Sequence, residues 1–527
     1  MFIEDLRNDF YNLLLGNRVL LLVHYDVDAI CTCKILQGLF KSDNISYTLV
    51  PVGGISELKT AYEENNEEVK YVVLVNCGGT IDLVDILQPE EDVVFFVLDS
   101  HKPTDVCNVY SDGQVRLVYR DEEENIPNFD DIFRDDDEEN EEEMPSGRED
   151  LEAFVERRRQ RREWETKRND LMFNYTQFSY YGKPSACTAV ELAWLLCRSG
   201  VEYTWAGCIA VSAYAATHTR SPAQALLDAH ALHRHLAAQL PSHGASVSME
   251  KDAFLPLYRT WSLENALKYS PVVAPHLRLH SLAGADRLRQ LLADMGIPLQ
   301  QARQAYRSMD VELRRSLLDA LDAAADKHHL PRLTHATYLL RRDHCAPLAA
   351  LDIVYCVMAL LELEGPGGFQ LALASVDTSS AECEARQRGL GAARRGLAAA
   401  AALAGATLAA RALHHAGPFA HFTISEGAAE CEWGPWWLAV CARWAGAGAG
   451  RGAGAVLVAA PRGRTVLLCG VPPPQRTDTR NLFGAAFEQA AAKCGASVSL
   501  DHFDSAVVTL PAAQRPQFLD ALTALLA

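Results

Sequence analysis

The sequence lacks a long apolar run and a secretory signal, and both absences limit where the protein works. Its longest uncharged stretch, residues 396–410, is mostly alanine and falls short of the ~20 apolar residues that cross a bilayer. The N-terminal MFIEDLRNDF lacks a basic segment followed by an apolar one, which is how secretory signals begin. We therefore expect a location inside the cell and no contact with a membrane.

Paired cysteines and an excess of basic residues are also missing. None of the 14 cysteines stands in C-x-x-C spacing, so we expect reduced thiols, mostly in the core, and no zinc site. The formal net charge is -19, and residues 121–143 hold 14 acidic residues against Arg134 alone, which leaves about -6 elsewhere. This balance argues against a basic protein that binds DNA non-specifically.

What is present is ordinary for a soluble globular protein: 527 residues, 49% hydrophobic and 22% charged. At 100 to 200 residues per domain, this length predicts about three or four structural units. The first 120 residues alternate short apolar runs with helical patterns, which predicts a mainly parallel sheet covered on both faces. The expected strands are 19–24, 47–52, 71–76, 93–98 and 115–119, and the expected helices between them are 29–40, 55–65 and 81–87.

A charged region follows this unit. Residues 121–148 are predicted to form a disordered acidic loop, because like charges repel and few apolar residues offset the entropy of ordering. The loop serves either as a solvating spacer or as an electrostatic gate that competes with DNA or docks a basic partner. For a gate, deleting residues 135–143 should tighten DNA binding at low salt; no change would favour the spacer.

Residues 150–170 are predicted to form a basic helix, with five arginines close together. Either this helix is solvated and partly neutralises the acidic loop, or it contacts DNA phosphates or a partner. The candidate contact residues are Arg157, Arg158, Arg159, Arg161 and Arg162.

From residue 185 to about 411 the pattern is helical, with stretches at 282–295, 299–329 and 349–364. A smaller α/β unit then returns. Its expected strands are 419–425, 455–460, 465–471 and 506–510, with helices at 481–493 and from 514 onward. The glycine-rich residues 445–455 have no G-x-G-x-x-G register, so we predict a flexible loop and not a phosphate cradle.

Polar residues follow three of the N-terminal strands, where parallel sheets gather function. They are Asp26, Asp28, Asn76, Asp99, Ser100 and His101. A phosphoesterase with two metal ions would place its ligands at this rim.

This order of residues resembles the DHH phosphoesterase superfamily, which includes the RecJ nucleases. Asp26 and Asp28 match its first motif, and Asp99 and His101 match two members of the third. Asn76 and Ser100 depart from the pattern, and the window 209–214, aligned with a further family aspartate, has no carboxylate. The resemblance therefore implies a vestigial site with too little ligand charge for two metals, so no metal and no cofactor are predicted.

Two interpretations of these carboxylates remain open. One weakly held metal on Asp26, Asp28 and Asp99 is the first. The second is that the carboxylates now accept hydrogen bonds from loop amides and helix N-termini.

Across nearly the whole chain the sequence is similar to the cell division control protein 45 family. The matching segments include VLVNCG, DILQPEED, NVYSDGQV, DIFRDDDEE, ERRRQRREWE, LLADMGIPL, GVPPP, NLFGAAFEQAA and FLDALTALLA. The resemblance implies the following division of the chain: 1–120, a DHH-like α/β domain; 121–148, the acidic loop; 149–220, the basic helix and the rest of the DHH-like domain; 221–370, a helical interaction insertion; and 371–527, a smaller C-terminal α/β domain of the DHHA1 type.

The resemblance further implies a nuclear, non-catalytic subunit of the eukaryotic replicative helicase, needed for initiation and elongation of DNA replication. Its partners would be the minichromosome maintenance hexamer, GINS and, weakly, single-stranded or fork DNA. One alternative is a Mn²⁺-dependent DHH-type phosphoesterase or single-strand exonuclease using Asp26, Asp28 and Asp99. A second is a protein that binds single-stranded DNA alone, with Trp164 and Tyr175 near the basic helix.

Overall fold

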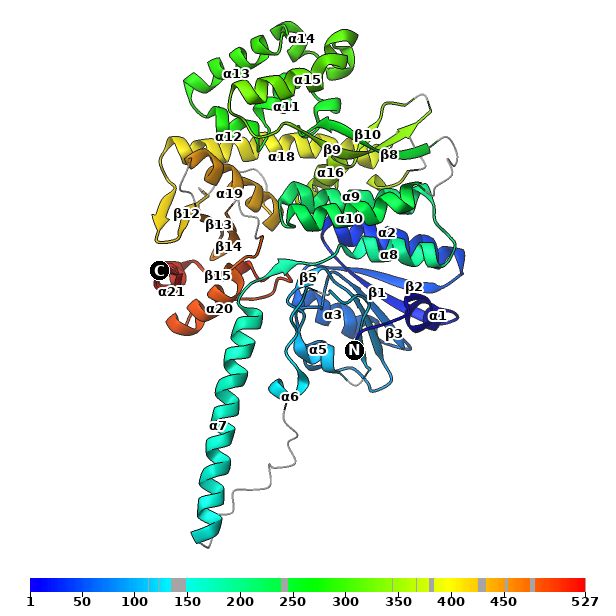
Figure 1. Ribbon diagram of the computed structural model, residues 1–527, viewed down its shortest axis with the longest axis vertical. Coiled ribbons are helices and arrows are strands. Elements are labelled where there is room, and N and C mark those ends of the chain that lie inside the picture. The colour runs from blue at the N-terminus through cyan, green and yellow to red at the C-terminus, as the bar shows by residue number, and fades with distance from the viewer. Residues whose placement is uncertain are drawn as a thin grey trace.

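The computed structural model describes residues 1–111, 113–121, 123–133, 148–237, 245–343, 345–365, 367–378, 383–424, 433–450, 454–473 and 479–526. Side chains are described within these ranges except at 148–155 and 157. Figure 1 shows an N-terminal α/β unit, a C-terminal α/β unit beside it, a mainly helical unit at the far end, and one long helix that projects from the body. None of the described helices is long and apolar enough to cross a membrane.

The N-terminal unit contains a fully parallel sheet of five strands in the order β2-β1-β3-β4-β6. Its strands are β1 (Arg18–His24), β2 (Ser46–Val52), β3 (Tyr71–Val75), β4 (Val94–Leu98) and β6 (Val115–Leu117). The predicted parallel α/β fold is thus confirmed, and each expected strand is present within one or two residues of its predicted bounds.

Both faces of this sheet are buried because successive residues of each strand point to opposite sides. On β1, Leu21 joins the core that includes α2 (Val27–Ser42), α8 (Ser185–Leu195) and α9 (Val201–Thr217). Leu22 joins the opposite core, with Leu58 of α3. The helices on that side are α3 (Ile55–Asn65), α4 (Leu83–Leu87) and α5 (Val106–Tyr110).

Part of the predicted acidic loop is ordered, which corrects the expectation for residues 123–133. Glu124 is buried and pairs with Lys102 at 2.8 Å, and the short helix α6 (Phe129–Ile132) follows it. A carboxylate with a buried cationic partner no longer repels its neighbours, so this end of the segment packs. Residues 134–147 lie outside the described residues. The predicted basic helix is present as α7 (Arg148–Thr176).

The middle of the chain is less helical than predicted, because it contains an antiparallel sheet in the order β10-β9-β8. The strands are β8 (Ala245–Ala253), β9 (Thr334–Arg342) and β10 (Leu348–Ala349). In β8 only Asp252 and Ala253 are buried, so the strand has no apolar alternation to mark it in the sequence.

The expected helix at 299–329 is also interrupted. It forms α14 (Leu299–Arg303) and α15 (Val311–Lys327). With α11 (Leu263–Lys268), α12 (Val273–Leu277) and α13 (Leu282–Asp294), these helices enclose a separate small core.

The C-terminal unit has a mixed sheet in the order β11-β12-β13-β14-β15, in which only β12 and β13 are parallel. Its strands are β11 (His414–Ala416), β12 (Phe419–Thr423), β13 (Ala455–Arg462), β14 (Thr465–Val471) and β15 (Val507–Pro511). The helices α20 (Phe483–Cys494) and α21 (Arg515–Leu526) cover one face. On the other lies α19 (Pro435–Ala449), which corrects the predicted flexible loop, since Gly446 and Gly448 are helical.

One hydrophobic core joins the two α/β units. It includes residues of α2 and α9, then of α16 (Ala350–Leu363) and α18 (Glu384–Ala409), and finally of α19 and β13. In Figure 1, α16 and α18 lie between the helical layer of the N-terminal unit and α19. The short helices α10 (Pro222–Ala237) and α17 (Gly368–Ser375) pack beside this layer.

Candidate functional site

Three neighbouring strands of the N-terminal sheet end at one edge, and each leads to a residue predicted for the site. Asp26 follows β1, Asn76 follows β3 and Asp99 follows β4, and these strands are adjacent in the order β1-β3-β4. Asp26 caps α2 and accepts a hydrogen bond from the Ala29 amide at 2.7 Å, and Asp28 lies in the first turn of that helix. The fold therefore brings the polar strand ends together, as parallel topology requires.

Asn76 lies at the centre of this cluster. Its Nδ2 donates to Oδ2 of Asp26 at 3.1 Å and to Oδ2 of Asp28 at 3.0 Å. Its Oδ1 accepts from the Ser185 hydroxyl at 2.6 Å and from the Ser100 amide at 3.4 Å. The amide nitrogen thus lies between the two carboxylates, in the space that a bridging cation would need.

Asp28 accepts four hydrogen bonds. Besides Asn76, it accepts from the backbone amides of Ser185 at 2.8 Å and Ala186 at 2.9 Å, and from the phenol of Tyr214 at 3.0 Å. Three of these donors meet on Oδ2 and one on Oδ1, so a metal ion at Asp28 would compete with donors that already occupy most of its about four acceptor sites. These residues do not fit the dinuclear metal centre of a phosphoesterase.

Ser100 stands where the DHH pattern has a histidine. Its side chain is fully buried, and its Oγ lies 2.6 Å from Oη of Tyr214. Since Tyr214 gives its only proton to Asp28, the Ser100 hydroxyl donates to Tyr214. Ser100 therefore extends the hydrogen-bond network around Asp28 and supplies no ligand of the imidazole type.

Asp99 and His101 form a buried ion pair, with 2.7 Å between Oδ1 and Nδ1. Asp99 also accepts from the amides of Gly79 at 2.8 Å and His101 at 2.9 Å. Burial opposes both charges, but the Asp99 carboxylate raises the pKa of His101 to about 9, and His101 with these amides lowers the pKa of Asp99. His24 nearby differs, because burial and the His101 charge lower its pKa to about 4.

The pair Asp26 and Asp28 holds a proton more tightly than free aspartates do. Burial and the adjacent Asp28 charge raise the pKa of Asp26 to about 7, and burial also raises the pKa of Asp28. Near neutral pH the pair therefore carries less than its full negative charge, which weakens it further as a cation site.

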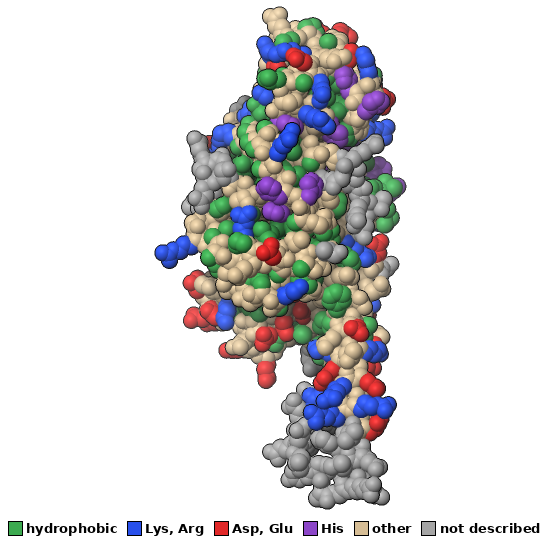
Figure 2. Space-filling view, turned by 90° about the vertical axis from the view of Figure 1, so that its left-hand side faces the viewer, with side chains coloured by type: hydrophobic (Ala, Val, Ile, Leu, Met, Phe, Trp, Pro, Cys, Tyr) green, Lys and Arg blue, Asp and Glu red, His purple; other side chains and the backbone are tan. Residues whose placement is uncertain are grey.

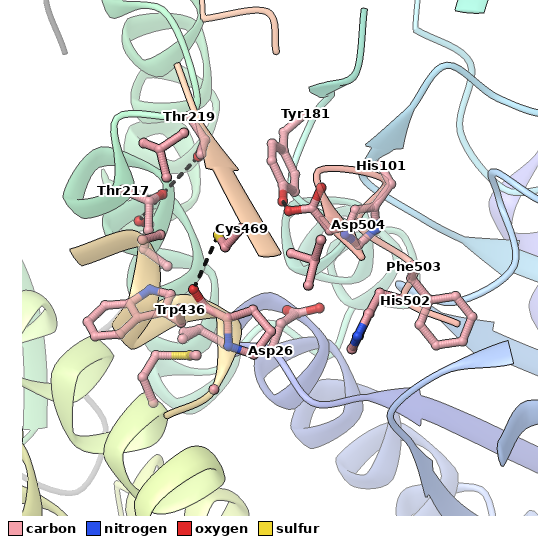
Figure 3. Close-up of a pocket in the computed structure, with 18 of the residues that line it drawn as sticks. Asp26, His101, Tyr181, Thr217, Thr219, Trp436, Cys469, His502, Phe503 and Asp504 are labelled. Atoms are coloured by element: carbon pink, nitrogen blue, oxygen red, sulfur yellow. Dashed lines mark hydrogen bonds between the residues drawn. The ribbon is translucent and has the colours of Figure 1, made fainter. Parts of the chain in front are cut away.

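A cavity of about 490 Å³ opens in front of this cluster, between the two α/β units. In Figure 3, His502, Phe503 and Asp504 lie on the same side as His101, and Trp436 lies on the opposite side. The Tyr181 phenol donates to Oδ2 of Asp504 at 3.1 Å. Both units thus contribute to one enclosed site.

Several residues of this site were not predicted from the sequence. Tyr214 is the last residue of the window 209–214, which offered no carboxylate but provides a phenol. Ser185, Tyr181 and Asp504 stand in no recognised motif, and their positions follow only from the packing of α8, β7 (Tyr180–Tyr181) and the loop before β15. The half-buried Arg443 of α19 also lines the cavity.

Among the described residues, one group of three or more His, Cys, Asp or Glu has ligand atoms that all lie within 4.8 Å of one another. It is Asp82, Asp105 and Cys107, and it includes none of the predicted site residues. Asp82 and Asp105 cap α4 and α5, which accounts for their position.

The arginines of α7 form a separate surface and do not line the cavity. In Figure 2, basic and acidic side chains alternate along this projecting helix. Arg159 pairs with Glu163 at 3.1 Å and Arg161 pairs with Glu165 at 3.2 Å. The side chain of Arg157 lies outside the described residues.

Comparisons with known proteins agree over most of the chain. A family model described as CDC45 matches residues 19–153 and 120–428. Proteins named cell division control protein 45 homolog from Mus musculus and Homo sapiens are 35% and 34% identical over 565 aligned residues, covering 100% of this chain and of each relative. The crystal structure of CDC45 from Entamoeba histolytica aligns with a TM-score of 0.72 and 20% identity, covering 99% of both chains, and thus has the same fold.

Proposed function

The chain belongs to the CDC45 family, and from this membership we propose that it is a DNA replication factor of the nucleus without catalytic activity of its own. It joins the minichromosome maintenance hexamer and GINS in the eukaryotic replicative helicase and is required for initiation and elongation. Its work is to hold partners together.

The observation that supports the non-catalytic part is the position of the Asn76 amide, which donates to both Asp26 and Asp28. A phosphoesterase of the DHH type needs carboxylates with free acceptor sites facing its metal ions. Here the Asn76 amide lies between the two carboxylates, and Asp28 accepts three further hydrogen bonds. One weak metal on Asp26, Asp28 and Asp99 would have to compete with the same donors.

Two features support the role in assembly. The continuous core across both α/β units fixes the relative positions of their outer surfaces. In addition, large apolar side chains remain exposed on neighbouring helices α8 and α10: Trp194, Leu195, Leu226 and Leu227 are 42% to 65% exposed. Exposed apolar side chains on neighbouring helices are candidates for a surface where partners bind.

Contact with single-stranded or fork DNA is assigned to α7. The side chains of Arg158 and Arg162 are exposed, and neither has a hydrogen bond or ion pair with another residue that the structure describes. They stand four residues apart, which places them on one face of the helix. Arg159 and Arg161, in contrast, already pair with glutamates of the same helix.

The deciding experiment is mass photometry of the purified chain mixed with purified GINS and minichromosome maintenance hexamer, with and without ATP. We expect a species whose mass contains all three components. A chain that stays alone under every condition would contradict the proposal.

A second arm tests the enzymatic alternative with nucleotide and oligonucleotide substrates in Mn²⁺. We expect no turnover by the wild-type chain. Turnover that disappears in Asp28→Ala would establish the phosphoesterase, whereas turnover that is equal in both proteins would come from a contaminating nuclease.

A further inference from the structure

A second cavity, of about 460 Å³, lies away from the strand ends, where the mainly helical unit meets β9, β10 and α18. Five arginines from four different segments line it: Arg259, Arg307, Arg342, Arg386 and Arg394. Apolar residues, among them Leu340, Leu348 and Leu390, form the rest of its wall. The volume is within the ~300 to 1,000 Å³ of small-molecule sites.

Among the described residues that line this cavity, arginines outnumber carboxylates. Arg259 is neutralised by the buried Asp252, with contacts of 2.6 and 2.9 Å. Asp352 is the one acidic residue of the described lining, and it accepts a hydrogen bond from the Leu257 amide at 2.8 Å. Burial raises the pKa of Asp352 to about 6. Arg307, Arg342 and Arg394 therefore face at most one negative charge within the described lining.

Backbone carbonyls orient two of the arginine side chains, and Arg394 has no carboxylate partner among the described residues. Arg394 donates to the carbonyl of Thr260 at 3.0 Å, and Arg386 donates to the carbonyl of Ser375 at 3.1 Å. Nη2 of Arg342 is buried and has no hydrogen-bond partner in the described part of the chain. Burial also lowers the pKa of Arg386 and of Arg394.

The chemistry of the lining selects one kind of anion. Several guanidinium groups that converge are the way proteins bind phosphate, because each can donate two parallel hydrogen bonds to its oxygens. No aromatic side chain is among the described lining residues, so nothing is placed to stack on a nucleobase. The apolar wall suits the aliphatic part of the molecule that carries the phosphate.

We propose that this cavity binds a phosphate monoester, supplied either by a small phosphorylated molecule or by a phosphoserine or phosphothreonine of a peptide. The phosphate oxygens accept from Arg342 and Arg307, and Arg394 supplies further charge. This ligand is independent of the proposed role in the helicase.

Isothermal titration calorimetry of the full chain tests the proposal, with inorganic phosphate, pyrophosphate and the blocked pentapeptide Ala-Ala-phosphoserine-Ala-Ala as probes. The unphosphorylated pentapeptide and chloride at equal ionic strength are the blanks. We expect saturable binding of phosphorylated probes only. Tighter binding of the peptide than of inorganic phosphate identifies a protein source, and equal or weaker binding identifies a small molecule.

Matched variants locate the site. Arg342→Met should weaken binding about tenfold or more, since it removes charge-assisted hydrogen bonds. Arg307→Ala, at an exposed position, should weaken it about threefold. The control is Arg341→Ala, which removes the same charge from the adjacent position of β9, where Arg341 pairs with Glu250 outside the cavity. It should change affinity less than about twofold.

Removing the unpartnered cation at Arg342 should also leave the melting temperature in phosphate-free buffer unchanged or higher. No saturable binding of any phosphorylated probe would overturn the proposal. Equal weakening by Arg341→Ala and Arg342→Met would also overturn it, because the effect would then be general electrostatics.

Discussion

Asn76 differs from aspartate by one group, because an amide NH2 replaces a carboxylate oxygen. The position therefore donates hydrogen bonds where an aspartate would accept them or bind a cation. An aspartate there would add a third carboxylate beside Asp26 and Asp28, whereas the amide donates a hydrogen bond to each of them. Buried carboxylates are stabilised either by hydrogen-bond donors or by a cation. Here hydrogen-bond donors stabilise Asp26 and Asp28. A single amide nitrogen therefore separates a structural cluster from a ligand set.

The ion pair between Asp99 and His101 predicts a pH dependence of stability. The pKa of His101 is about 9 in the folded chain and ~6.5 in an unfolded one, so the folded state holds the proton more tightly. This stabilisation is fully present below pH ~6.5 and is lost as the pH rises through about 9. It is on the order of 3 kcal/mol.

The measurement is urea unfolding of the wild-type chain and of His101→Gln at pH 6 and at pH 9.5, with a further pH value near 4 for the control. We expect the variant to be clearly less stable at pH 6 and the difference to shrink at pH 9.5. His24→Gln is the contrasting control. Its imidazole has a pKa of about 4, so the stability that the wild type loses between pH ~6.5 and 4 should be partly retained in that variant. An equal effect of His101→Gln at both pH values would contradict the assignment.

The position of the candidate site could be predicted from the sequence, but its hydrogen bonding could not. Asp26, Asp28, Asn76 and Asp99 follow apolar runs of strand length, so their meeting at one sheet edge follows from topology. Two of the donors to Asp28 stand 157 and 186 residues farther along the chain, at Ser185 and Tyr214. No local pattern links positions that are so distant, and only the packing of α8 and α9 on α2 brings them together.

At the level of elements, α7 is the helix whose function depends most on its charged face. It is polar on all sides, so tertiary burial contributes little to it and pairs such as Arg159–Glu163 stabilise it locally. Near its middle, Lys167 pairs with Asp131 of α6 at 2.6 Å. The ion pair holds one side of α7 against α6, and the other side is free to contact DNA.

We predict that replacing both Arg158 and Arg162 with alanine weakens binding to single-stranded DNA about tenfold at low salt. The slope of log affinity against log salt should fall by about 1.4, because two phosphate contacts are lost. The matched control replaces both Arg159 and Arg161 with alanine, which changes the net charge equally but removes arginines already paired with glutamates. Fluorescence anisotropy at several salt concentrations measures both. Binding that is unaffected by the first pair of substitutions would remove α7 from the DNA interface.

The elements that the sequence did not reveal share a physical cause. In α19 the glycines that favour a loop permit close packing: Gly446 approaches Val456 of β13, and Gly448 approaches Leu408 of α18. In β8 and β9 polar residues mix with apolar ones without strict alternation: most of β8 is partly or fully exposed, and β9 buries four consecutive residues from Thr337 to Leu340. Tertiary contacts decide both outcomes, and local propensity describes neither.

At the level of the whole molecule, the core shared by the two α/β units makes them one mechanical body. Leu397 of α18 is fully buried in this core, whereas Leu321 of α15 is fully buried in the separate core of the helical unit. Truncating either leucine creates a cavity that costs about 2 to 5 kcal/mol. The two substitutions should differ in how far their effects extend.

Hydrogen exchange measured by mass spectrometry should reveal that difference. In Leu397→Ala, we expect faster exchange in α9, α16 and α19 together, because these helices pack in one core. In Leu321→Ala, faster exchange should be limited to residues 255–333. Faster exchange in α19 alone after Leu397→Ala would mean that the two α/β units open independently.

Because its two halves share one core, the protein keeps its outer surfaces at fixed distances and orientations relative to one another. Molecules bound on its different faces are held at one separation and one orientation, so each experiences the other at an effective concentration set by this geometry and not by the bulk solution. The buried leucines and alanines of α16 and α18 thus determine the distance between sites that they never touch.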